Sequence, residues 1–550
     1  MNSASIPSPR EASPTPTHDL SPRTLKSFAL GLVALGVVWR ILRYLLNFPI
    51  WGDEAMLALN FASFDYGELT SKLSNLQIAP ILFLWGERLA LTSFGPDERS
   101  LRLLPLLASL GSLALYWRLT GLLLDPMARL FAIGFLAVAM WPVSMGSLIK
   151  PYSLDLFVAL LLLTLAVHWL RRTNQKRWLV ALALVVPLAP LASYPSVFVG
   201  GAVSLVLVVA VWRQGWAARS WFAVYNAGLL LGFALTIVIG NRHLANTTSG
   251  SSTQEGMQSY WASAFPPHGL LPFAKWFVLQ TTGQMTAYPI GAERGGSIVT
   301  VALVIAGVVL WIRQRQTRWL LLLLAPLALN LIAAVLHRYP FGGSCRLSQA
   351  LAPSVCILAG LGSAFLIHRF AGTSIRQRRW VVGAVCLFAL VGVGGAAIDI
   401  AFPYRAPAFA FMRSTWAAIR AEVAPSDAVV VDMPISGLEP VFAWHLLVEH
   451  PRTSWYGELP SDLRSGDRVW GFSGGSVPDS AALLGEKLRR RDPSWRLVKR
   501  IPFTHEKQNR KDIAQWFELV CYERGSETIP ADPPGNVISA RPTQEPPSRR

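Results

Sequence analysis

The chain contains a long series of apolar stretches, and this repetition constrains its fold more than any other feature. The chain is 52% hydrophobic and only 15% charged, whereas soluble domains are about 25% charged. A helix needs about 20 apolar residues to cross a bilayer core of about 30 Å. The sequence therefore predicts a mainly α-helical polytopic membrane protein with about eleven transmembrane helices. The expected spans are 26–46, 100–123, 127–146, 152–170, 178–194, 196–212, 221–240, 297–312, 319–336, 347–367 and 380–398.

Basic residues are concentrated in alternate loops between these spans. Loops rich in Lys and Arg face the cytoplasm, so the N-terminus is expected inside and the residues after the last span outside. The net charge of +18 follows from this topology, and nucleic acid is not expected as a partner. The residues that set the orientation are Arg118, Arg129, Arg171, Arg172, Lys176, Arg177, Arg213, Arg219, Arg313, Arg315, Arg318, Arg369, Arg376, Arg378 and Arg379.

The two ends of the chain differ in amino-acid composition from the apolar centre. Residues 1–24 and 525–550 are polar and rich in Pro, and they predict disordered tails around a transmembrane domain over 25–398. Residues 399–524 predict a small extracytoplasmic α/β domain. Its expected strands are 428–432, 468–472, 495–502 and 516–522, and its expected helices are 440–448 and 480–490.

Two outside segments are too long for simple turns. The first, over 47–98, contains apolar pieces at 55–64 and 80–92, which predict interfacial helices. Gln77 and Pro80 precede the second piece, where proline suits the start of a helix. The other segment, 242–296, has a polar stretch, Asn246–Glu255, and aromatic residues such as Trp261. Interfacial anchoring and a flexible lid over a site remain open for it.

Two adjacent carboxylates, Asp53 and Glu54, follow the first span. A carboxylate close to hydrocarbon is costly and is a candidate functional group, although a helix N-terminus also favours acidic residues. A carboxylate at the edge of the membrane can accept the proton of an attacking hydroxyl. On the residues alone, both interpretations remain open.

Two basic motifs on the outer side contain candidate anion-binding residues. One is Lys150-Pro151-Tyr152-Ser153-Leu154-Asp155, where Lys150 either pairs with Asp155 or binds a phosphate. The other runs from His337 to Phe341 and is followed by Arg346. Arginines in an outside loop oppose the positive-inside bias, which indicates an anion such as a phospholipid headgroup or a phosphate-bearing substrate. The candidate substrate-binding residues are Lys150, Tyr152, Arg338, Tyr339 and Arg346.

The order of these motifs resembles the C-type polytopic membrane glycosyltransferases. The resemblance rests on Asp53-Glu54, on Ala79-Pro80-Ile81-Leu82, on the run Glu98–Pro105 that enters the second span, and on Lys150–Asp155. Within that group, residues 26–366 are similar to the bacterial branch of protein mannosyltransferases, aminoarabinose transferases and RgtA/B/C/D-like enzymes.

The resemblance implies roles for individual residues. Asp53 would lie at the catalytic centre with Glu54 as its neighbour, and Lys150, Arg338 and Arg346 would engage the phosphate of a polyprenyl-linked sugar. Ala79 departs from the usual pattern, which has a second proline there. Metal-binding acids are not evident, and the four cysteines have no zinc-site spacing, so neither a metal nor a cofactor is expected.

The sequence thus leads to a hypothesis about function. A multi-pass enzyme of the bacterial cytoplasmic membrane would move a sugar from a polyprenyl-phosphate carrier to a hydroxyl of a lipid, glycan or protein at the outer face, inverting the anomeric carbon. The alternative is a transporter or flippase for a lipid-linked or small solute, a class that commonly shows internal repeats and midplane charges. A structural membrane protein whose terminal domain binds a partner is a third reading.

Overall fold

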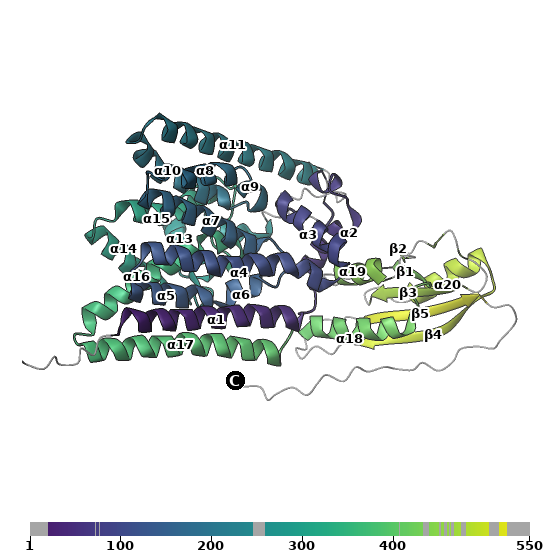
Figure 1. Ribbon diagram of the computed structural model, residues 1–550. Helices are drawn as coiled ribbons and strands as arrows, with labels where there is room; N and C mark the ends of the chain where they lie inside the picture. Colours follow the sequence, from purple (N-terminus) through teal and green to yellow (C-terminus); the bar gives the residue numbers. More distant parts are fainter. Residues whose placement is uncertain are drawn as a thin grey trace, which may run out of the picture.

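The protein is described by a computed structural model covering residues 20–71, 73–75, 77–245, 259–405, 407–432, 439–449, 453–455, 459–460, 463, 467–474, 480–504 and 516–524. The polar stretch Asn246–Glu255, the tail 525–550 and most of the tail 1–24 lie outside these residues. The described chain is a bundle of helices followed by a small α/β domain, which confirms the predicted fold class (Figure 1).

Helices occupy all eleven stretches that the sequence predicts as spans. The membrane part consists of α1 (Pro22–Leu46), α2 (Gly52–Ser63), η1 (Glu68–Thr70), α3 (Ile81–Phe94), α4 (Glu98–Leu123), α5 (Pro126–Ala137), α6 (Met140–Met145), α7 (Tyr152–Arg171), α8 (Lys176–Val185), α9 (Ala189–Ala192), α10 (Ser196–Trp212), α11 (Trp216–Ala245), η2 (Ala262–Ala264), α13 (Leu270–Thr281), η3 (Gln284–Thr286), α14 (Ile298–Arg313), α15 (Thr317–Val335), η4 (Cys345–Leu351), α16 (Ala352–Phe370) and α17 (Ser374–Ala401).

Seven of the described helices are long and apolar enough to cross a membrane, and α5, α10 and α14 are shorter apolar helices. Two predicted spans are interrupted. The stretch 127–146 is divided between α5 and α6, and 178–194 between α8 and α9. Pro142, Pro187 and Pro190 lie near these interruptions, and proline lacks the N–H that a continuous helix needs.

Helix α1 begins earlier than the predicted tail boundary at residue 24. Ser21 precedes the helix, and its side chain accepts a hydrogen bond from the backbone N–H of Thr24, while Pro22 occupies the first turn. Serine is a favoured N-cap and proline a favoured first helical residue. The assignment of residues 22–24 to a disordered tail was therefore wrong.

Glycines allow the central helices to approach closely. A Cβ atom at Gly307 of α14 would lie 2.1 Å from the backbone oxygen of Leu358, and one at Gly362 of α16 would lie 1.9 Å from that of Leu303. Neither position can accept a larger residue without separating α14 from α16. Small residues serve this purpose in membrane helices, where burial of apolar side chains gives little drive for association. Helices α11 and α17, by contrast, are the least buried of the seven long helices.

The C-terminal domain has a mixed five-stranded sheet in the order β2-β1-β3-β5-β4. Strands β1 and β2, and β1 and β3, pair in parallel, whereas β3–β5 and β4–β5 are antiparallel. The domain consists of α18 (Pro407–Glu422), β1 (Ala428–Asp432), α19 (Glu439–Glu449), β2 (Thr453–Trp455), β3 (Arg468–Gly474), α20 (Ser480–Arg491), β4 (Trp495–Thr504) and β5 (Trp516–Arg524).

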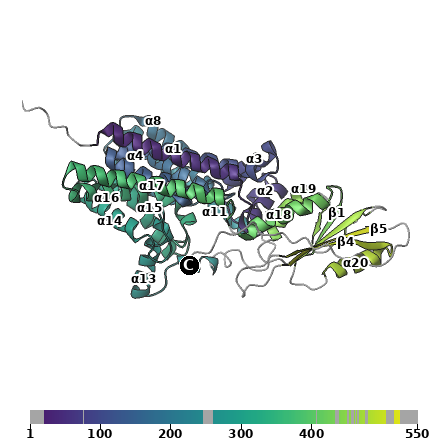
Figure 2. The same ribbon diagram turned by 90° about the horizontal axis from the view of Figure 1, so that it is seen from below.

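The two parts of the chain lie end to end. Figure 1 shows the long helices side by side, with the sheet beyond one end of the bundle and with α2 and α3 on the side of the bundle nearest to it. Figure 2 shows the same arrangement from below. This end of the bundle therefore carries both the predicted interfacial helices of the first outside segment and the C-terminal domain.

Candidate active site

A cavity of about 400 Å³ opens at the end of the bundle that faces the C-terminal domain. It lies between the start of α7, the turn from α9 to α10, the end of α11 and the loop after α15. Four of the candidate substrate-binding residues line it, namely Lys150, Tyr152, Arg338 and Tyr339. Segments that are far apart in the sequence thus form one hollow.

Asp53 lies between two cations. Its Oδ1 is 2.9 Å from Nζ of Lys150, and its Oδ2 is 3.8 Å from Nη1 of Arg346. The Asp53 side chain is 31% exposed, whereas those of Lys150 and Arg346 are 7% and 11% exposed. The carboxylate is therefore accessible, while the two cations are largely shielded from water. The structure brings together three predicted site residues from three different segments.

Lys150 is a buried ammonium group with capacity for a further partner. Two of its three N–H donors are used, by Asp53 and by Oε1 of Gln77, which lies 2.8 Å from Nζ. Burial lowers the pKa of Lys150, and the nearby charge of Asp53 opposes this shift. A ligand anion would occupy the remaining donor and stabilise the charged form.

Glu54 points away from the cavity into a buried network. Its Oε1 accepts a hydrogen bond of 2.8 Å from the backbone N–H of Ile149, and its Oε2 lies 3.7 Å from Nη2 of Arg102. Burial raises the pKa of Glu54, although the charge of Arg102 opposes the shift. Glu54 therefore holds the backbone beside Lys150, whereas Asp53 is the carboxylate that faces the cations.

The other candidate residues occupy the wall of the cavity. Arg338 is exposed there. The ring of Tyr339 packs edge-to-face against Phe198, with centroids 5.4 Å apart, which fixes its orientation. Trp261, from the second outside segment, lines the same cavity and lies 5.5 Å from the guanidinium of Arg346. Phe265 of the same segment lines the cavity too, so two aromatic residues of that segment contribute to the site.

Asp155 does not pair with Lys150, which binds Asp53 instead. It lines the cavity with 4% exposure, and its Oδ1 has no hydrogen-bond partner among the described residues. The alternative in which Lys150 pairs with Asp155 is therefore wrong. Tyr194 lines the cavity as well.

Two buried arginines of α1 serve the fold. Arg40 donates to Ser109 and to the backbone oxygens of Gly36 and Ala137. Arg43 forms an ion pair with Asp399 of α17. Both are buried. These contacts assign both arginines to helix packing.

Sequence reasoning missed two residues that stand beside the cation cluster. Gln77 was interpreted only as part of a helix start, and its bond to Lys150 could not be inferred from that position. Arg405 lies between α17 and α18, with its guanidinium 4.0 Å from the ring centroid of Trp51. Partial burial lowers the pKa of Arg405, followed by the like charge of Arg346, while Glu54 and Asp53 oppose the shift. No local pattern marks Arg405, because its contact with Trp51 joins segments that are far apart in the sequence.

Among the described residues, no group of three or more His, Cys, Asp or Glu side chains could hold a metal ion. The lining of the cavity includes Lys150, Arg338 and the buried Asp155, and the accessible carboxylate of Asp53 lies beside it with Arg346. Such an arrangement suits an anionic ligand.

Comparison with known proteins identifies the type of fold. Residues 79–239 match the family described as dolichyl-phosphate-mannose-protein mannosyltransferase, whereas no curated protein matches the sequence. The chain is similar to the crystal structure of ArnT from Cupriavidus metallidurans bound to undecaprenyl phosphate, with 12% identity, a TM-score of 0.54 and coverage of 90% of this chain and 98% of that one. The apo state of the same ArnT gives 13% identity, a TM-score of 0.50 and the same coverage.

Identity this low shows a shared fold only, and the family match covers the part of the chain that includes Lys150 and Tyr152. Together these findings confirm the resemblance that the sequence predicts: the chain is a polytopic membrane protein with the fold of the C-type glycosyltransferases.

Proposed function

We propose that the protein transfers a sugar from a polyprenyl-phosphate carrier to a hydroxyl group at the outer face of the bacterial cytoplasmic membrane. The observation that carries this proposal is the contact of Asp53 with both Lys150 and Arg346 beside a cavity of about 400 Å³. A base next to buried cations suits a reaction in which a hydroxyl loses a proton while a phosphate leaves.

In the proposed reaction, Asp53 accepts the proton of the acceptor hydroxyl. The acceptor oxygen attacks the anomeric carbon, and the bond from that carbon to the phosphate oxygen breaks. The electron pair leaves with the polyprenyl phosphate, whose added charge is stabilised by Lys150 and Arg346. Attack opposite the leaving group inverts the anomeric carbon. Cations of the chain perform this stabilisation, so the proposal includes no metal or cofactor.

The substrate classes follow from the chemistry of the cavity and from the shared fold. ArnT of the same fold binds undecaprenyl phosphate, which supports a lipid-linked donor here. Arg338 and Arg405 would extend the anion-binding surface, and Tyr152 and Tyr339 would contact the donor. The acceptor is a lipid, glycan or protein hydroxyl, and its identity is left to experiment.

The position of the cavity favours this reaction over transport. Its lining comes from residues near helix ends and connecting loops at one end of the bundle, such as Lys150, Pro195 and Tyr339. A transporter site is expected near the midplane, between repeats.

The test is a transfer assay with the purified full-length protein in detergent or liposomes. Radiolabelled polyprenyl-phosphate sugars are supplied with a membrane extract as a source of acceptors. Label that moves from the carrier to an acceptor supports the proposal. Uptake of the lipid into liposomes without turnover favours the flippase and contradicts it.

A further inference from the structure

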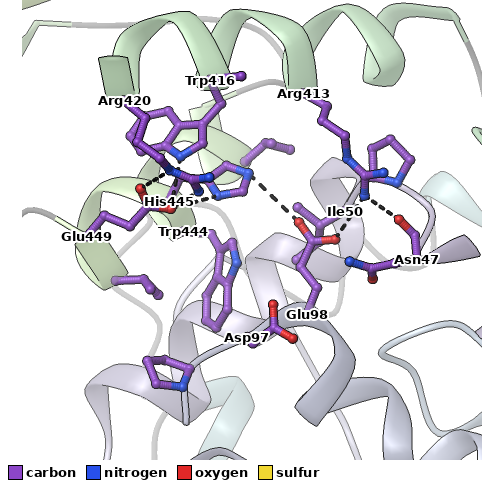
Figure 3. Close-up of a pocket in the computed structure, with 15 residues that line it drawn as sticks. Asn47, Ile50, Asp97, Glu98, Arg413, Trp416, Arg420, Trp444, His445 and Glu449 are labelled. Carbon is purple, nitrogen blue, oxygen red and sulfur yellow. Dashed lines mark hydrogen bonds and ion pairs between the residues drawn. The ribbon is translucent and has the colours of Figure 1, made fainter. Parts of the chain in front are cut away.

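The C-terminal domain contacts the membrane part at the end of the bundle that carries α2 and α3 (Figure 1). A hollow of about 300 Å³ lies between α18 and α19 on one side and the start of α4 on the other. Figure 3 shows Arg413 and His445 pointing from the domain toward Glu98. The polar and charged residues that line this hollow include Asn47, Glu98, Arg413, Arg420, His445 and Glu449.

Glu98 contacts residues of both the membrane part and the C-terminal domain. Its Oε2 lies 3.6 Å from Nη2 of Arg413 and 3.3 Å from Nη1 of Arg102, and Arg413 also donates to the backbone oxygen of Asn47. Nε2 of His445 is 3.9 Å from Oε1 of Glu98. Burial lowers the pKa of His445 to about 4, so its ring is neutral at pH 7. Arg413 is therefore the cation that the C-terminal domain contributes to Glu98.

Arg102 continues the contacts toward the cavity. It donates to Oδ1 of Asn47 over 2.6 Å, and its Nη2 forms the 3.7 Å ion pair with Glu54. Glu54 in turn accepts the N–H of Ile149, the residue before Lys150. A continuous series of polar contacts thus joins α18 to the segment that carries Lys150.

Through this series, the loss of a contact between the C-terminal domain and α4 can affect the backbone beside Lys150. The side chains of Arg102 and Glu54 are each 1% exposed, so water screens their charges weakly. Loss of Arg413 would leave Glu98 with Arg102 as its main cation, and Arg102 cannot move toward Glu98 without weakening its contact with Glu54. The side chain of Arg413 is 45% exposed and that of Glu98 is 10% exposed, so the loss of Arg413 acts mainly by leaving a largely buried carboxylate with one cation fewer.

We propose that the C-terminal domain positions the catalytic cavity: Arg413, acting through Glu98, Arg102 and Glu54, holds the backbone that carries Lys150. Arg413 is a positioning residue in this account and touches no substrate. The consequence for catalysis rests on the proposed function, whereas the structural coupling does not.

Hydrogen–deuterium exchange of the full-length protein tests the coupling without any substrate. In Arg413→Ala, the amide of Ile149 is expected to exchange about tenfold faster than in the wild type. The reason is that Glu54, which accepts its hydrogen bond, would be less firmly held. Arg420→Ala is the matched control, since Arg420 lies on the same helix and pairs with Glu449 within the domain. It is expected to leave the exchange of Ile149 within about twofold of the wild type.

Arg413→Lys retains the charge and is expected to restore most of the protection. If Arg413→Ala also loosens strands β3 and β5, Glu98→Gln tests the same series from the membrane side. It releases Arg102 from Glu98, so Arg102 should hold Glu54 more firmly and exchange at Ile149 should become slower. The coupling is refuted if neither Arg413→Ala nor Glu98→Gln changes that exchange, or if Arg420→Ala changes it as much as Arg413→Ala does.

The transfer assay provides the catalytic readout. Arg413→Ala is expected to lower kcat/KM about tenfold, and Arg420→Ala by less than about twofold, if Lys150 is misplaced as the contacts imply. If the wild-type protein transfers no sugar, the proposed function is refuted. The exchange experiment would still test whether Arg413 is coupled to Ile149. Normal transfer by Arg413→Ala, with an active wild type, would overturn the catalytic part.

Discussion

At Asp53, a single accessible carboxylate is shared by two largely buried cations, Lys150 and Arg346. The positive charge therefore exceeds the negative charge at this point. A phosphodiester carries one negative charge, and the phosphate that leaves it approaches two at neutral pH. In the proposed reaction, the cations would therefore interact more strongly with the departing phosphate than with the bound donor, which is the condition for accelerating a reaction.

The substitution Arg346→Ala is expected to raise the KM for the lipid-linked donor about tenfold, which corresponds to about 1.4 kcal/mol of binding. One of the two cations beside Asp53 is lost, while the carboxylate remains. Donor-dependence curves of the transfer reaction measure the effect. Arg99→Ala is the control, because Arg99 is exposed on the same end of the bundle and does not line the cavity. Equal KM values in the two variants would assign Arg346 to structure.

The pH dependence of transfer should report Lys150. Because burial lowers the pKa of this group, the ammonium loses its proton at a lower pH than the ordinary lysine value of about 10.4. Donor binding is expected to be intact at neutral pH and to fall as the pH rises through this lowered pKa. In Lys150→Arg the cation persists to higher pH, so the alkaline limb of kcat/KM should move upward. An alkaline limb that is the same in both proteins would exclude Lys150 as its origin.

The site residues show what a sequence can and cannot predict about a cavity. Asp53, Lys150 and Arg346 were selected because topology placed their loops on one side of the membrane, and the structure brings them into contact. Their roles remain predictions. Gln77 and Arg405 were missed because their importance depends on distances between segments, which neither charge nor periodicity encodes.

Among the elements, α1 and α17 are held together by a buried polar cluster. Asp399 of α17 forms an ion pair with Arg43 of α1 and accepts a hydrogen bond of 2.7 Å from Nε1 of Trp39. The ends of the two helices that face the C-terminal domain are thereby fixed to each other. Arg43 and Asp399 are 356 residues apart in the sequence, so their pairing could be found only in three dimensions.

The substitution Asp399→Ala is expected to lower the free energy of unfolding by about 3 kcal/mol, since Arg43 would keep a buried charge without its partner. Thermal unfolding of the purified protein in detergent measures this as a lower Tm. Cys386→Ala, on an exposed position of the same helix, is expected to leave the Tm unchanged. Equal Tm values for the two variants would show that the pair contributes nothing to stability.

The apolar stretches in the sequence predicted where the membrane helices lie, but not where two of them are interrupted. All eleven expected stretches are helical, but two of them are interrupted near prolines. In the C-terminal domain, four expected strands and two expected helices occur close to their predicted bounds, whereas the short strand β2 and the helix α18 were not predicted. The pairing of β2 with β1 depends on the sheet as a whole, so three residues alone give too weak a local signal.

Across the whole molecule, the cavity and the clusters of basic residues lie at opposite ends of the bundle. Helices α7, α14 and α16 begin near the end that carries the cavity, and their other ends lead into Arg171, Arg313 and Arg369. This separation agrees with the positive-inside rule and supports an outward-facing site. The C-terminal domain lies at the same end as the cavity (Figure 1).

The sidedness can be measured by labelling single cysteines in a protein whose four native cysteines are replaced by serine. Ser63→Cys, at the exposed end of α2, is expected to react with a membrane-impermeant maleimide in intact cells. Gln314→Cys, after α14, is expected to react only after the membrane is opened. The reverse pattern would place the cavity on the cytoplasmic side.

The most direct test of the central claim is the rate of sugar transfer from a polyprenyl-phosphate carrier by Asp53→Asn in liposomes. Asparagine preserves the size of the side chain but cannot accept the proton of the acceptor hydroxyl as a carboxylate does. A loss of at least about 100-fold in kcat is expected. Expression should be normal, and the control Asp65→Asn, which changes another carboxylate of the same segment, should have normal activity. Transfer by Asp53→Asn at a rate near that of the wild type would contradict the claim that Asp53 is the base.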